Sequence, residues 1–403
     1  MSERRICVVT TSRADYGLLQ GLMQAIREDE ALALQVIATG MHLCPEFGLT
    51  YRAIEQDGFR IDRKIEMLLS ADSDSAAAKS VGVGLLAFAD ALVELSPDLI
   101  VVLGDRFELL AAAIAALLAK IPIAHIHGGE TSQGAVDEGV RHAVTKMASL
   151  HFAATEAYRL RIIQMGEEPC RVFAFGAPGL DALHQIELLT EPELEARLDF
   201  ALAGPIALVT YHPVTLERDT AERQIENLLI ALRQERVRAV FTKANADAQG
   251  RLINRRIARF CQDHPADYRL YDNLGQRVYL SCLRQVDLMI GNSSSGLIEA
   301  PSFKLPVINI GDRQRGRIKA ANVIDVGYST EEIAAGIRQA LSRAWREKIQ
   351  DMTNPYAGQG DGKVNFHIKE QLKQVELNEA FLKKQFCDIP HNIHQRPHFP
   401  AAP

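Results

Sequence analysis

Short apolar runs rich in β-branched residues alternate with longer helical patterns along most of this chain. Such alternation is typical of parallel sheets in which crossover helices join successive strands. The run Leu99–Leu103 is apolar at every position, which indicates a central strand buried on both faces. The sequence therefore predicts an α/β fold of the doubly wound type.

The alternation occurs as two series, and a charged, proline-containing stretch at Leu188–Leu198 separates them. Because 403 residues exceed the size of one ordinary core, we expect two Rossmann-type domains, at 1–187 and 188–363, facing a central cleft. We expect a helix at Val364–Lys384 to pack back on the first domain, and the proline-rich tail 389–403 to be poorly ordered. The predicted strands are Ile6–Thr10, Leu34–Ala38, Leu99–Leu103, Ile121–Ile126, His151–Ala154, Val172–Phe175, Ile206–Tyr211, Val237–Thr242, Tyr268–Tyr271, Leu288–Ile290 and Val307–Ile310.

The charge and the cysteine content limit the expected partners and the expected compartment. The formal net charge is −6 and no basic stripe is present, so nucleic acid and anionic membranes are not expected as main partners. The six cysteines are scattered without a CxxC spacing, which favours a reducing compartment. The N-terminus enters a strand without the apolar core of a signal peptide, and the longest apolar stretch, Leu109–Ala119, is too short to cross a bilayer. We therefore expect a cytoplasmic protein.

Candidate catalytic residues follow two strands of the first series, where ligands bind in open α/β sheets. Asp105 and Arg106 come directly after the apolar central strand, although a helix cap and a surface charge would explain them equally. His127 and Glu130 lie in the loop after the next strand and are candidates for proton transfer. His125, within that strand, is expected to be a packed core histidine.

A metal site is the alternative interpretation of the His125-x-His127 pattern, because two histidines on one face of a strand recur in metal-dependent hydrolases. No clear third and fourth ligands follow nearby, so we expect no metal. A GxGxxA match at Gly82–Ala87 follows a helix-like stretch rather than a strand, so we expect no nicotinamide dinucleotide. The sequence thus predicts a protein without a cofactor.

Asp137 and Glu138 open another predicted helix, where adjacent acids usually cap the helix and favour its dipole. This segment nevertheless lies between two parallel strands, so its start must return to the same edge of the sheet. Asp105, Glu130 and Asp137 are therefore expected to converge on one small volume. Clustered acids would raise the pKa of at least one of them.

In the second series, His212 ends a strand and is held there by Pro213, while Asn245 follows the next strand and is either a ligand or a helix cap. The stretch Gly291–Glu299 lies between an apolar strand and a short helix. Its hydroxyl and backbone N–H groups, from Ser293 and Ser294, suit a diphosphate, and Glu299 suits the two hydroxyls of a ribose. Two arginines after the following strand, Arg313 and Arg317, would add charge-assisted hydrogen bonds.

At these positions the chain resembles the hydrolysing UDP-N-acetylglucosamine 2-epimerases of sialic acid synthesis and their legionaminic acid counterparts. The resemblance covers about residues 5 to 380. Its motifs keep their order and spacing: TSRADYG at 11–17, GDRFE at 104–108, HIHGGE at 125–130, DEGVRHAVTKM at 137–147, HPVT at 212–215, GNSSSGLIEAP at 291–301 and INIGDRQRGR at 308–317.

The resemblance implies a GT-B-like fold, namely two Rossmann-type domains around a cleft, without metal or nicotinamide. It implies catalytic roles for Asp105, Asp137 and His212, with Arg106 beside them. Some family members have glutamate where this chain has His127, so either His127 or Glu130 would take over that proton transfer. The positions implied to contact UDP are Arg13, Asn245, Leu274, Ser293, Ser294, Glu299 and Arg313.

The expected reaction converts UDP-GlcNAc and water to UDP and N-acetylmannosamine, through elimination to a 2-acetamidoglucal followed by hydration. Three alternatives remain: the same reaction on a UDP-2,4-diacetamido-2,4,6-trideoxyglucose for legionaminic acid, a GT-B glycosyltransferase, and a non-catalytic UDP-sugar binding protein. The clustered acids disfavour the last, because binding a diphosphate gains nothing from nearby carboxylates. The resemblance also implies a homodimer or homotetramer.

Overall fold

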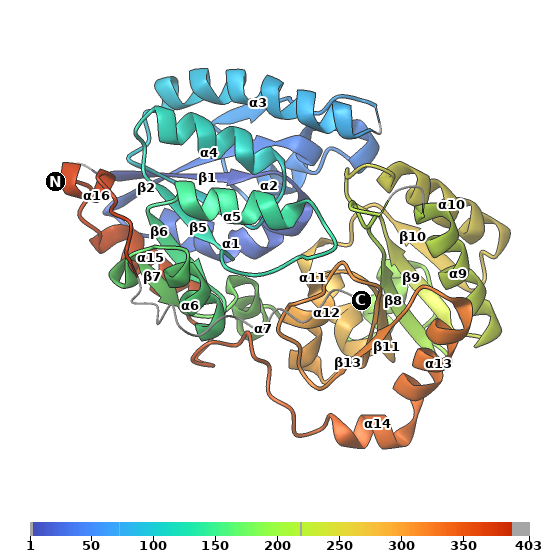
Figure 1. The fold of residues 1–403 in the computed structure, drawn as a ribbon. Helices are drawn as coiled ribbons and strands as arrows, with labels where there is room; N and C mark the ends of the chain where they lie inside the picture. The colour runs from blue at the N-terminus through green and yellow to red at the C-terminus, as the bar shows by residue number, and fades with distance from the viewer. Residues whose placement is uncertain (1–2, 72, 218–219, 389–403) are drawn as a thin grey trace, which may run out of the picture.

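The computed structural model describes residues 3–71, 73–217 and 220–388. It contains two all-parallel sheets, each with helices on both faces (Figure 1). The predicted α/β architecture with two doubly wound units is confirmed. The predicted disorder of the tail concerns 389–403, which lie outside the described residues.

The first sheet has seven strands in the order β3-β2-β1-β4-β5-β6-β7. The apolar strand β4 lies at its centre and is buried at every residue, as its sequence predicts. The direction of strand addition reverses between β1 and β4, which makes their carboxyl ends the switch point where ligands bind. The strands span Arg63–Ile65 (β3), Leu32–Thr39 (β2), Arg4–Thr10 (β1), Leu99–Leu103 (β4), Ile123–Ile126 (β5), Leu150–Ala153 (β6) and Val172–Ala174 (β7).

Helices cover both faces of this sheet. One hydrophobic cluster packs α1 and α15 against one face, and a second packs α3 and α4 against the other. The helices of this half are α1 (Arg13–Arg27), α2 (Tyr51–Gln56), α3 (Asp74–Leu95), α4 (Glu108–Leu118), α5 (Asp137–Met147), α6 (Glu156–Gln164) and α7 (Ala182–Gln185).

The second sheet has six strands in the order β10-β9-β8-β11-β12-β13, and its switch point lies between β8 and β11. Clusters that include α9, α10 and α13 on one face and α8 and α11 on the other bury it. The strands span Tyr268–Tyr271 (β10), Arg238–Thr242 (β9), Ile206–Thr210 (β8), Leu288–Gly291 (β11), Val307–Ile310 (β12) and Val323–Val326 (β13). The helices are α8 (Glu191–Leu198), α9 (Ala221–Gln234), α10 (Gly250–Asp263), α11 (Gly275–Gln285), α12 (Ser295–Ile298), α13 (Thr330–Leu341) and α14 (Arg343–Lys348).

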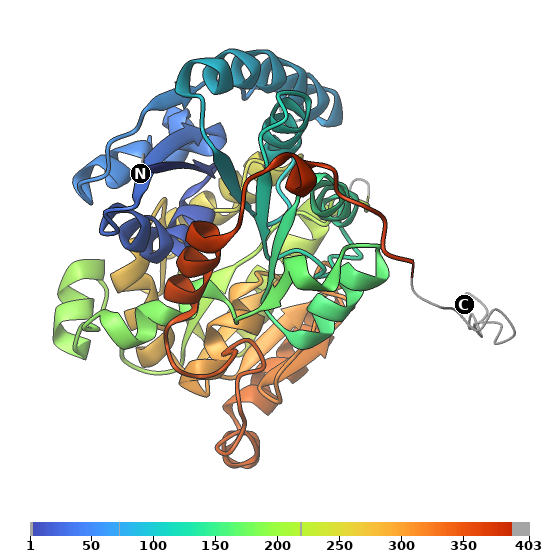
Figure 2. The ribbon, with the colours of Figure 1, turned by 90° about the vertical axis from the view of Figure 1, so that its left-hand side faces the viewer.

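The chain returns to the first sheet at its end. Helix α15 (Val364–Gln374) packs beside α1 and adds Ile368 and Leu372 to the core of that half (Figure 2). Asp181 fixes the start of α15, because its carboxylate accepts hydrogen bonds from the backbone N–H groups of Val364 and Asn365 at 3.0 and 2.7 Å. The first domain is therefore built from two segments of the chain, one before and one after the second domain.

Four features differ from the sequence-based expectation. The prediction of a single late helix at Val364–Lys384 is wrong. Helix α15 ends at Gln374, and a short helix α16 (Glu379–Leu382), capped by Asn378, follows it. The charged stretch Leu188–Leu198, which separates the two series, contains helix α8, and this helix begins at a capping box formed by Thr190 and Glu193. Strands β3 and β13 were not predicted, because each is a short edge strand with only one fully buried residue.

Two loops, one from each half of the molecule, contact each other. Gly134 of the first half lies so close to the second that an added Cβ would come within 2.9 Å of the Asp312 backbone. In the same way, a Cβ at Gly316 would come within 2.8 Å of the Thr131 hydroxyl. The loops 131–134 and 312–317 are therefore in close contact across the two halves.

Candidate active site

A cavity of about 640 Å³ lies between the two sheets, beside both switch points. Of the site residues predicted from the sequence, the structure brings all but two to its wall. The exceptions are His127 and Glu130, which are buried but do not line the cavity. The predicted residues that line it are Arg13, Asp105, Arg106, Asp137, His212, Asn245, Leu274, Ser293, Ser294, Glu299 and Arg313.

The turn after β1 fixes Arg13 at the start of α1. Asp15 accepts hydrogen bonds from the backbone N–H groups of Thr11 and Ser12, both at 2.8 Å, and thereby closes this turn. One terminal nitrogen of Arg13 donates to the Lys243 carbonyl of the other half at 3.3 Å. The other terminal nitrogen is buried without a partner among the described residues, so it is free to bind an anion in the cavity.

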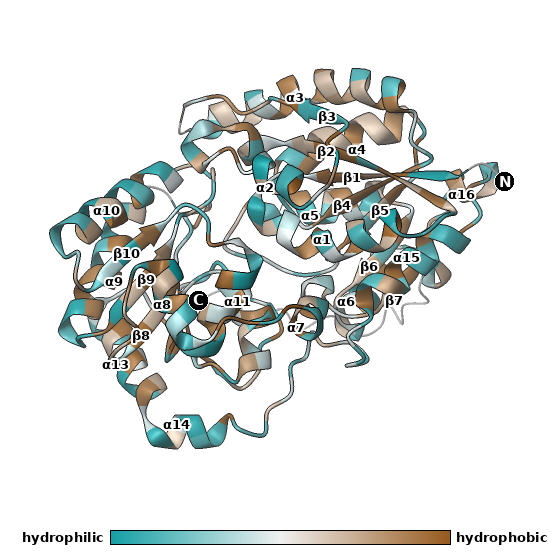
Figure 3. Cartoon of the chain, turned by 180° about the vertical axis from the view of Figure 1, so that it is seen from behind, coloured by the Kyte–Doolittle hydropathy of each residue, from teal (hydrophilic) through white to brown (hydrophobic). Residues whose placement is uncertain are grey.

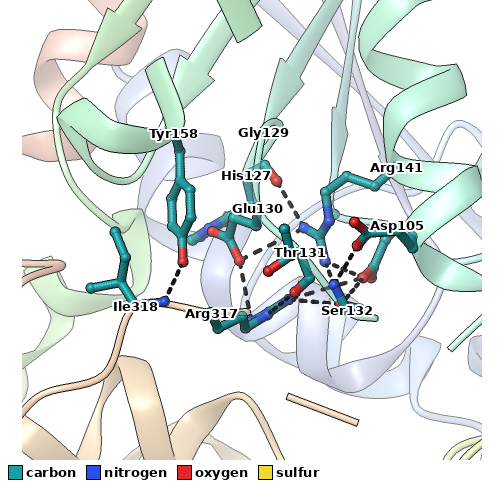
Figure 4. A network of polar contacts seen from close by, with 12 residues as sticks. Asp105, His127, Gly129, Glu130, Thr131, Ser132, Arg141, Tyr158, Arg317 and Ile318 are labelled. Carbon is teal, nitrogen blue, oxygen red and sulfur yellow. Dashed lines mark hydrogen bonds and ion pairs between the residues drawn. The ribbon is translucent and has the colours of Figure 1, made fainter. Parts of the chain in front are cut away.

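Asp105 follows β4 and keeps 23% of its side chain exposed to the cavity. Its carboxylate forms an ion pair with Arg141 and accepts a hydrogen bond from the Ser132 hydroxyl at 3.4 Å (Figure 4). Burial alone would raise the pKa of Asp105, but the guanidinium groups of Arg141, Arg317 and Arg313 hold it below its ordinary value. Asp105 is therefore ionised at neutral pH.

Asp137, the first residue of α5, has the opposite environment. Its side chain is buried, lines the cavity and forms no hydrogen bond or ion pair with another described residue. Burial, together with the carboxylates of Asp105 and Asp247, raises the pKa of Asp137 to about 7. One wall of the cavity therefore presents an ionised carboxylate and a second carboxyl that holds a proton through part of the neutral range.

His127 and Glu130 form a buried pair behind this wall (Figure 4). The His127 Nδ1 lies 2.5 Å from the Glu130 Oε1, and the His127 backbone has a φ of 63°, in the left-handed region. Burial alone would raise the pKa of Glu130, but Arg317, His127 and Arg141 hold it well below its ordinary range. Asp105, Glu130 and Asp137 thus do not all converge on the cavity, because the arginines draw Glu130 into the protein.

Arg317 connects the two halves of the molecule at this point. It belongs to the second half, yet its Nη1 lies 3.2 Å from the Glu130 Oε2 and its Nε donates to the Thr131 carbonyl at 2.8 Å. Its Nη2 lies 4.0 Å from the Asp105 carboxylate. Arg317 was expected to bind the leaving group, and it lines the cavity. It also contacts two acids of the first half, Asp105 and Glu130.

His212 is held at the exit of β8 by Asn292. The Asn292 amide accepts from the His212 N–H at 2.7 Å and donates to the His212 carbonyl at 2.8 Å. The Nδ1 of His212 accepts from the Asn245 N–H at 3.2 Å, which leaves the proton of the neutral ring on Nε2. Burial and the positive charges of Arg313, Arg106 and Arg13 lower the pKa of His212 well below its ordinary value, so the ring is neutral.

The second half contributes hydroxyl, guanidinium and carboxyl groups to the cavity wall. Ser293 and Ser294 line the cavity just before α12, a helix of only four residues. Arg313 donates to the Asn292 carbonyl at 3.2 Å, but its Nε is buried without a partner among the described residues. The Glu299 Oε2 is unsatisfied in the same way, and burial raises the pKa of Glu299. Arg313 and the two serines can bind an anion, whereas Glu299 can accept hydrogen bonds from the hydroxyl groups of a ligand.

The interpretation of His125 as a core histidine is confirmed. Its Nε2 lies 2.8 Å from the Gly104 carbonyl and its Nδ1 lies 3.1 Å from the Thr145 hydroxyl, and the side chain is fully buried. Because both ring nitrogens are engaged, His125 cannot serve as a metal ligand. Among the described residues, no group of three or more His, Cys, Asp or Glu side chains could hold a metal ion.

Two functional residues were not singled out from the sequence. Arg141 is fully buried and holds both Asp105 and the His127 carbonyl, the latter at 2.8 Å. Its position four residues after Asp137 on one helix places both on the same face, which is the signal that could have found it. Asn292 lies within the serine-rich turn, but nothing in the sequence shows that it binds the backbone of His212.

Two Rossmann-type domains with a cavity between their switch points, lined by arginines, serines and carboxyl groups, define the GT-B-like fold. The family model described as UDP-N-acetylglucosamine 2-epimerase matches residues 24–373 of this chain. The chain therefore belongs to the UDP-N-acetylglucosamine 2-epimerase family, as its motifs predict, and it is an enzyme.

Two curated relatives cover almost the whole chain. The GDP/UDP-N,N'-diacetylbacillosamine 2-epimerase (hydrolyzing) of Campylobacter jejuni is 41% identical over 96% of this chain and 100% of its own length. The UDP-N,N'-diacetylbacillosamine 2-epimerase (hydrolyzing) of Legionella pneumophila is 40% identical over 94% of this chain and 98% of its own length.

A solved structure supports the fold. The UDP-GlcNAc 2-epimerase of Neisseria meningitidis bound to UDP-GlcNAc superposes with a TM-score of 0.77 at 19% sequence identity, covering 92% of this chain and 100% of that one. At this identity the match supports the architecture alone. The predicted GT-B-like arrangement of two Rossmann-type domains is confirmed.

Proposed function

We propose that this enzyme hydrolyses UDP-2,4-diacetamido-2,4,6-trideoxyglucose, releasing UDP and the free sugar with carbon 2 inverted, in the synthesis of a nonulosonate of the legionaminic acid type. Relatives at 41% and 40% identity carry names for this chemistry, whereas the UDP-N-acetylglucosamine 2-epimerase of Neisseria meningitidis is 28% identical. UDP-GlcNAc, the substrate expected from the sequence, is the second candidate. The observation that carries the proposed reaction is that Asp105 and Asp137 line one cavity with opposite preferences for a proton.

The reaction needs one group that accepts a proton from C2 and another that returns a proton to the opposite face. The C2 hydrogen is not acidic by itself, so its removal must accompany cleavage of the C1–O bond to UDP. Asp105 starts as the ionised carboxylate and Asp137 as the protonated acid, which supplies one acceptor and one donor. The water oxygen then bonds to C1 of the 2-acetamidoglucal, while Asp137 gives its proton to C2 on the opposite face. The proton that the water loses returns to Asp137, and the proton taken up by Asp105 passes to solvent, so that both carboxyl groups regain their starting states.

The departing diphosphate carries negative charge that the cavity must stabilise. Arg13 of the first half and Arg313 of the second each keep a buried nitrogen without a partner among the described residues, and Ser293 and Ser294 line the same cavity. Positively charged donors held in place before the reaction stabilise a leaving group without reorganisation. Helix α12 is too short to add much, so we assign this task to the side chains.

We propose that His127 and Glu130 act as positioning residues. Glu130 neutralises Arg317 and Arg141, and these two arginines hold the Asp105 carboxylate ionised. His127 completes the pair through its bond to Glu130, while its Nε2 is buried without a partner among the described residues. His212 remains a proposed contact of the substrate, held neutral at the cavity wall.

Kinetics on both nucleotide sugars test the proposed substrate. We expect kcat/KM for UDP-2,4-diacetamido-2,4,6-trideoxyglucose to exceed that for UDP-GlcNAc by at least about tenfold, as one or two pocket contacts to the groups at C4 and C6 would produce. A preference for UDP-GlcNAc would overturn the proposed sugar and leave the proposed reaction standing.

We also propose a cytoplasmic location, which the free state of all six cysteines supports.

A further inference from the structure

The segment 127–136 leads from β5 to α5, and Asp137 is the first residue of that helix. The residue before it, Val136, occupies the N-cap position and has no polar side chain with which to cap the helix. In a capping box, the side chain of the third helical residue accepts a hydrogen bond from the N-cap N–H, but here that residue is Gly139, which has no side chain. The Val136 N–H therefore has no acceptor within its own helix.

The acceptor comes from the second domain. The Thr215 hydroxyl accepts a hydrogen bond from the Val136 N–H at 3.0 Å, and the Leu216 N–H donates to the Gly134 carbonyl at 3.4 Å. Figure 3 shows α5 in the first half of the molecule and β8, which leads to Thr215, in the second. The start of the helix that carries Asp137 is thus bound to the opposite domain through Thr215.

The backbone that carries Thr215 is itself held in place. Two hydrogen bonds fix the backbone of His212, three residues earlier, at the exit of β8. Pro213 has a restricted φ, and Val214 is buried. Thr215 therefore connects two residues of the cavity wall that belong to opposite domains, His212 and Asp137.

Thr215 acts on the cavity from outside it. Its side chain is half-buried and does not line the cavity, so it does not touch a ligand there. A water molecule could accept the same hydrogen bond from Val136, but water would not tie α5 to the second domain. Since water can replace the hydroxyl, the bond contributes little to the stability of the fold. A contact without a role in the reaction would thus be replaceable at no cost to the activity.

We propose that Thr215 is a positioning residue for the reaction: its hydroxyl holds the start of α5 and so fixes Asp137 relative to the groups of the second domain. This inference rests on the proposed function, in which Asp137 returns a proton to C2. Proton transfer requires the donor within hydrogen-bond reach of the acceptor, so a shift of about 1 Å in Asp137 slows it strongly. Binding of UDP needs no contact with Asp137 and is expected to be insensitive to Thr215.

Steady-state kinetics of three variants test the proposal. Thr215→Val removes the hydroxyl and keeps a β-branched side chain, and we expect kcat to fall by about tenfold. The inhibition constant of UDP should stay within about twofold of the wild type, and the melting temperature should not change. Thr215→Ser retains the hydroxyl and should keep kcat within about threefold of the wild type. Thr353→Val, at an exposed threonine in the loop after α14, is the matched control and should behave as the wild type.

The fate of the intermediate gives a second readout. When Asp137 returns the proton less efficiently, more of the 2-acetamidoglucal leaves the cavity before it is hydrated. Thr215→Val should therefore release a larger fraction of 2-acetamidoglucal than the wild type, measured by NMR of the reaction mixture. Thr215→Ser and Thr353→Val should release the wild-type fraction.

Hydrogen exchange on the free enzyme tests the contact without any substrate. The Val136 amide should exchange at least about threefold faster in Thr215→Val than in the wild type, and at the wild-type rate in Thr215→Ser. Should the wild type convert neither nucleotide sugar, the proposed function would fail, and these exchange rates would still decide whether the hydroxyl holds the start of α5.

Three results would overturn the role of Thr215 in an active enzyme. They are an unchanged kcat in Thr215→Val, an equal loss of kcat in Thr215→Ser, and an unchanged exchange rate at Val136. A fall in kcat with an equal fall in affinity for UDP would overturn it as well, because that result would indicate a general disturbance of the cavity.

Discussion

The Arg317 guanidinium of the second domain lies 3.2 Å from the Glu130 carboxylate of the first, and both side chains are buried. This ion pair crosses the cleft beside the cavity, so the charges that keep Asp105 ionised come partly from the opposite domain. The ionised state of Asp105 therefore depends on contacts between the two domains.

Replacement of Arg317 should damage both effects. In Arg317→Ala, Glu130 would lose its nearest guanidinium and Asp105 one of the charges that lower its pKa, so we expect kcat/KM to fall by roughly 10²–10³-fold. Arg317→Lys should retain more activity, because a positive charge remains although the bond to the Thr131 carbonyl loses its geometry. Steady-state kinetics with melting temperatures for both variants check this; equal activities of both variants and the wild type would contradict it.

Asp137→Asn should impair the chemistry with little effect on UDP binding. The amide cannot exchange a proton, so we expect kcat to fall by roughly 10²–10⁴-fold, while UDP still binds through the other wall. Release of 2-acetamidoglucal instead of the epimerised sugar is the sharper readout, measured by NMR of the reaction mixture. Asp263→Asn, on the surface of α10, is the control and should behave as the wild type.

The pH dependence of Asp137 has a definite sign. Because its pKa is raised to about 7, the protonated form is favoured by folding, and the stability that it contributes is lost as the pH rises from about 4 through 7. Denaturant unfolding should therefore show the wild type losing stability across this window relative to Asp137→Asn. The profile of kcat/KM should likewise have a limb near pH 7, and an unchanged limb in the asparagine variant would assign it to another group.

Arg13 should contribute to affinity for the nucleotide. Arg13 lines the cavity from the first domain, and one of its buried nitrogens has no partner within the described part of the chain, so Arg13→Ala should raise the inhibition constant of UDP by about tenfold. Arg255→Ala, an exposed arginine of α10, provides a control for loss of net charge. Should both variants bind UDP as the wild type does, the diphosphate would have to lie elsewhere in the cavity.

Most of the fold could be predicted because strongly periodic segments carry their own signal. The central strand Leu99–Leu103 was predicted with its observed bounds, since its burial on both faces leaves no polar position. The short edge strands β3 and β13 lack that signal, because an edge strand is only partly covered. The break in the late helix depends on Asn378, whose side chain caps α16, a local preference that helical periodicity does not reveal.

The cavity wall was predictable in part because residues after parallel strands meet at one edge. That rule predicted that Asp105, Glu130 and Asp137 converge at the edge of the first sheet, and Asp105 and Asp137 do line the cavity. It could not show that Glu130 turns inward, because the cause is Arg317, which is distant in sequence and belongs to the other domain. The position of a motif in the sequence predicts which loop carries a side chain. The direction in which that side chain points depends on contacts between the domains.

The most direct test of the proposed mechanism is the reaction in heavy water with UDP-2,4-diacetamido-2,4,6-trideoxyglucose as the sole substrate. The mechanism predicts release of UDP without any acceptor and a free sugar of inverted configuration that carries one deuterium at C2. An inverted product that retains its original C2 hydrogen, or release of UDP only when an acceptor is added, would contradict proton exchange by the two acids of the cavity.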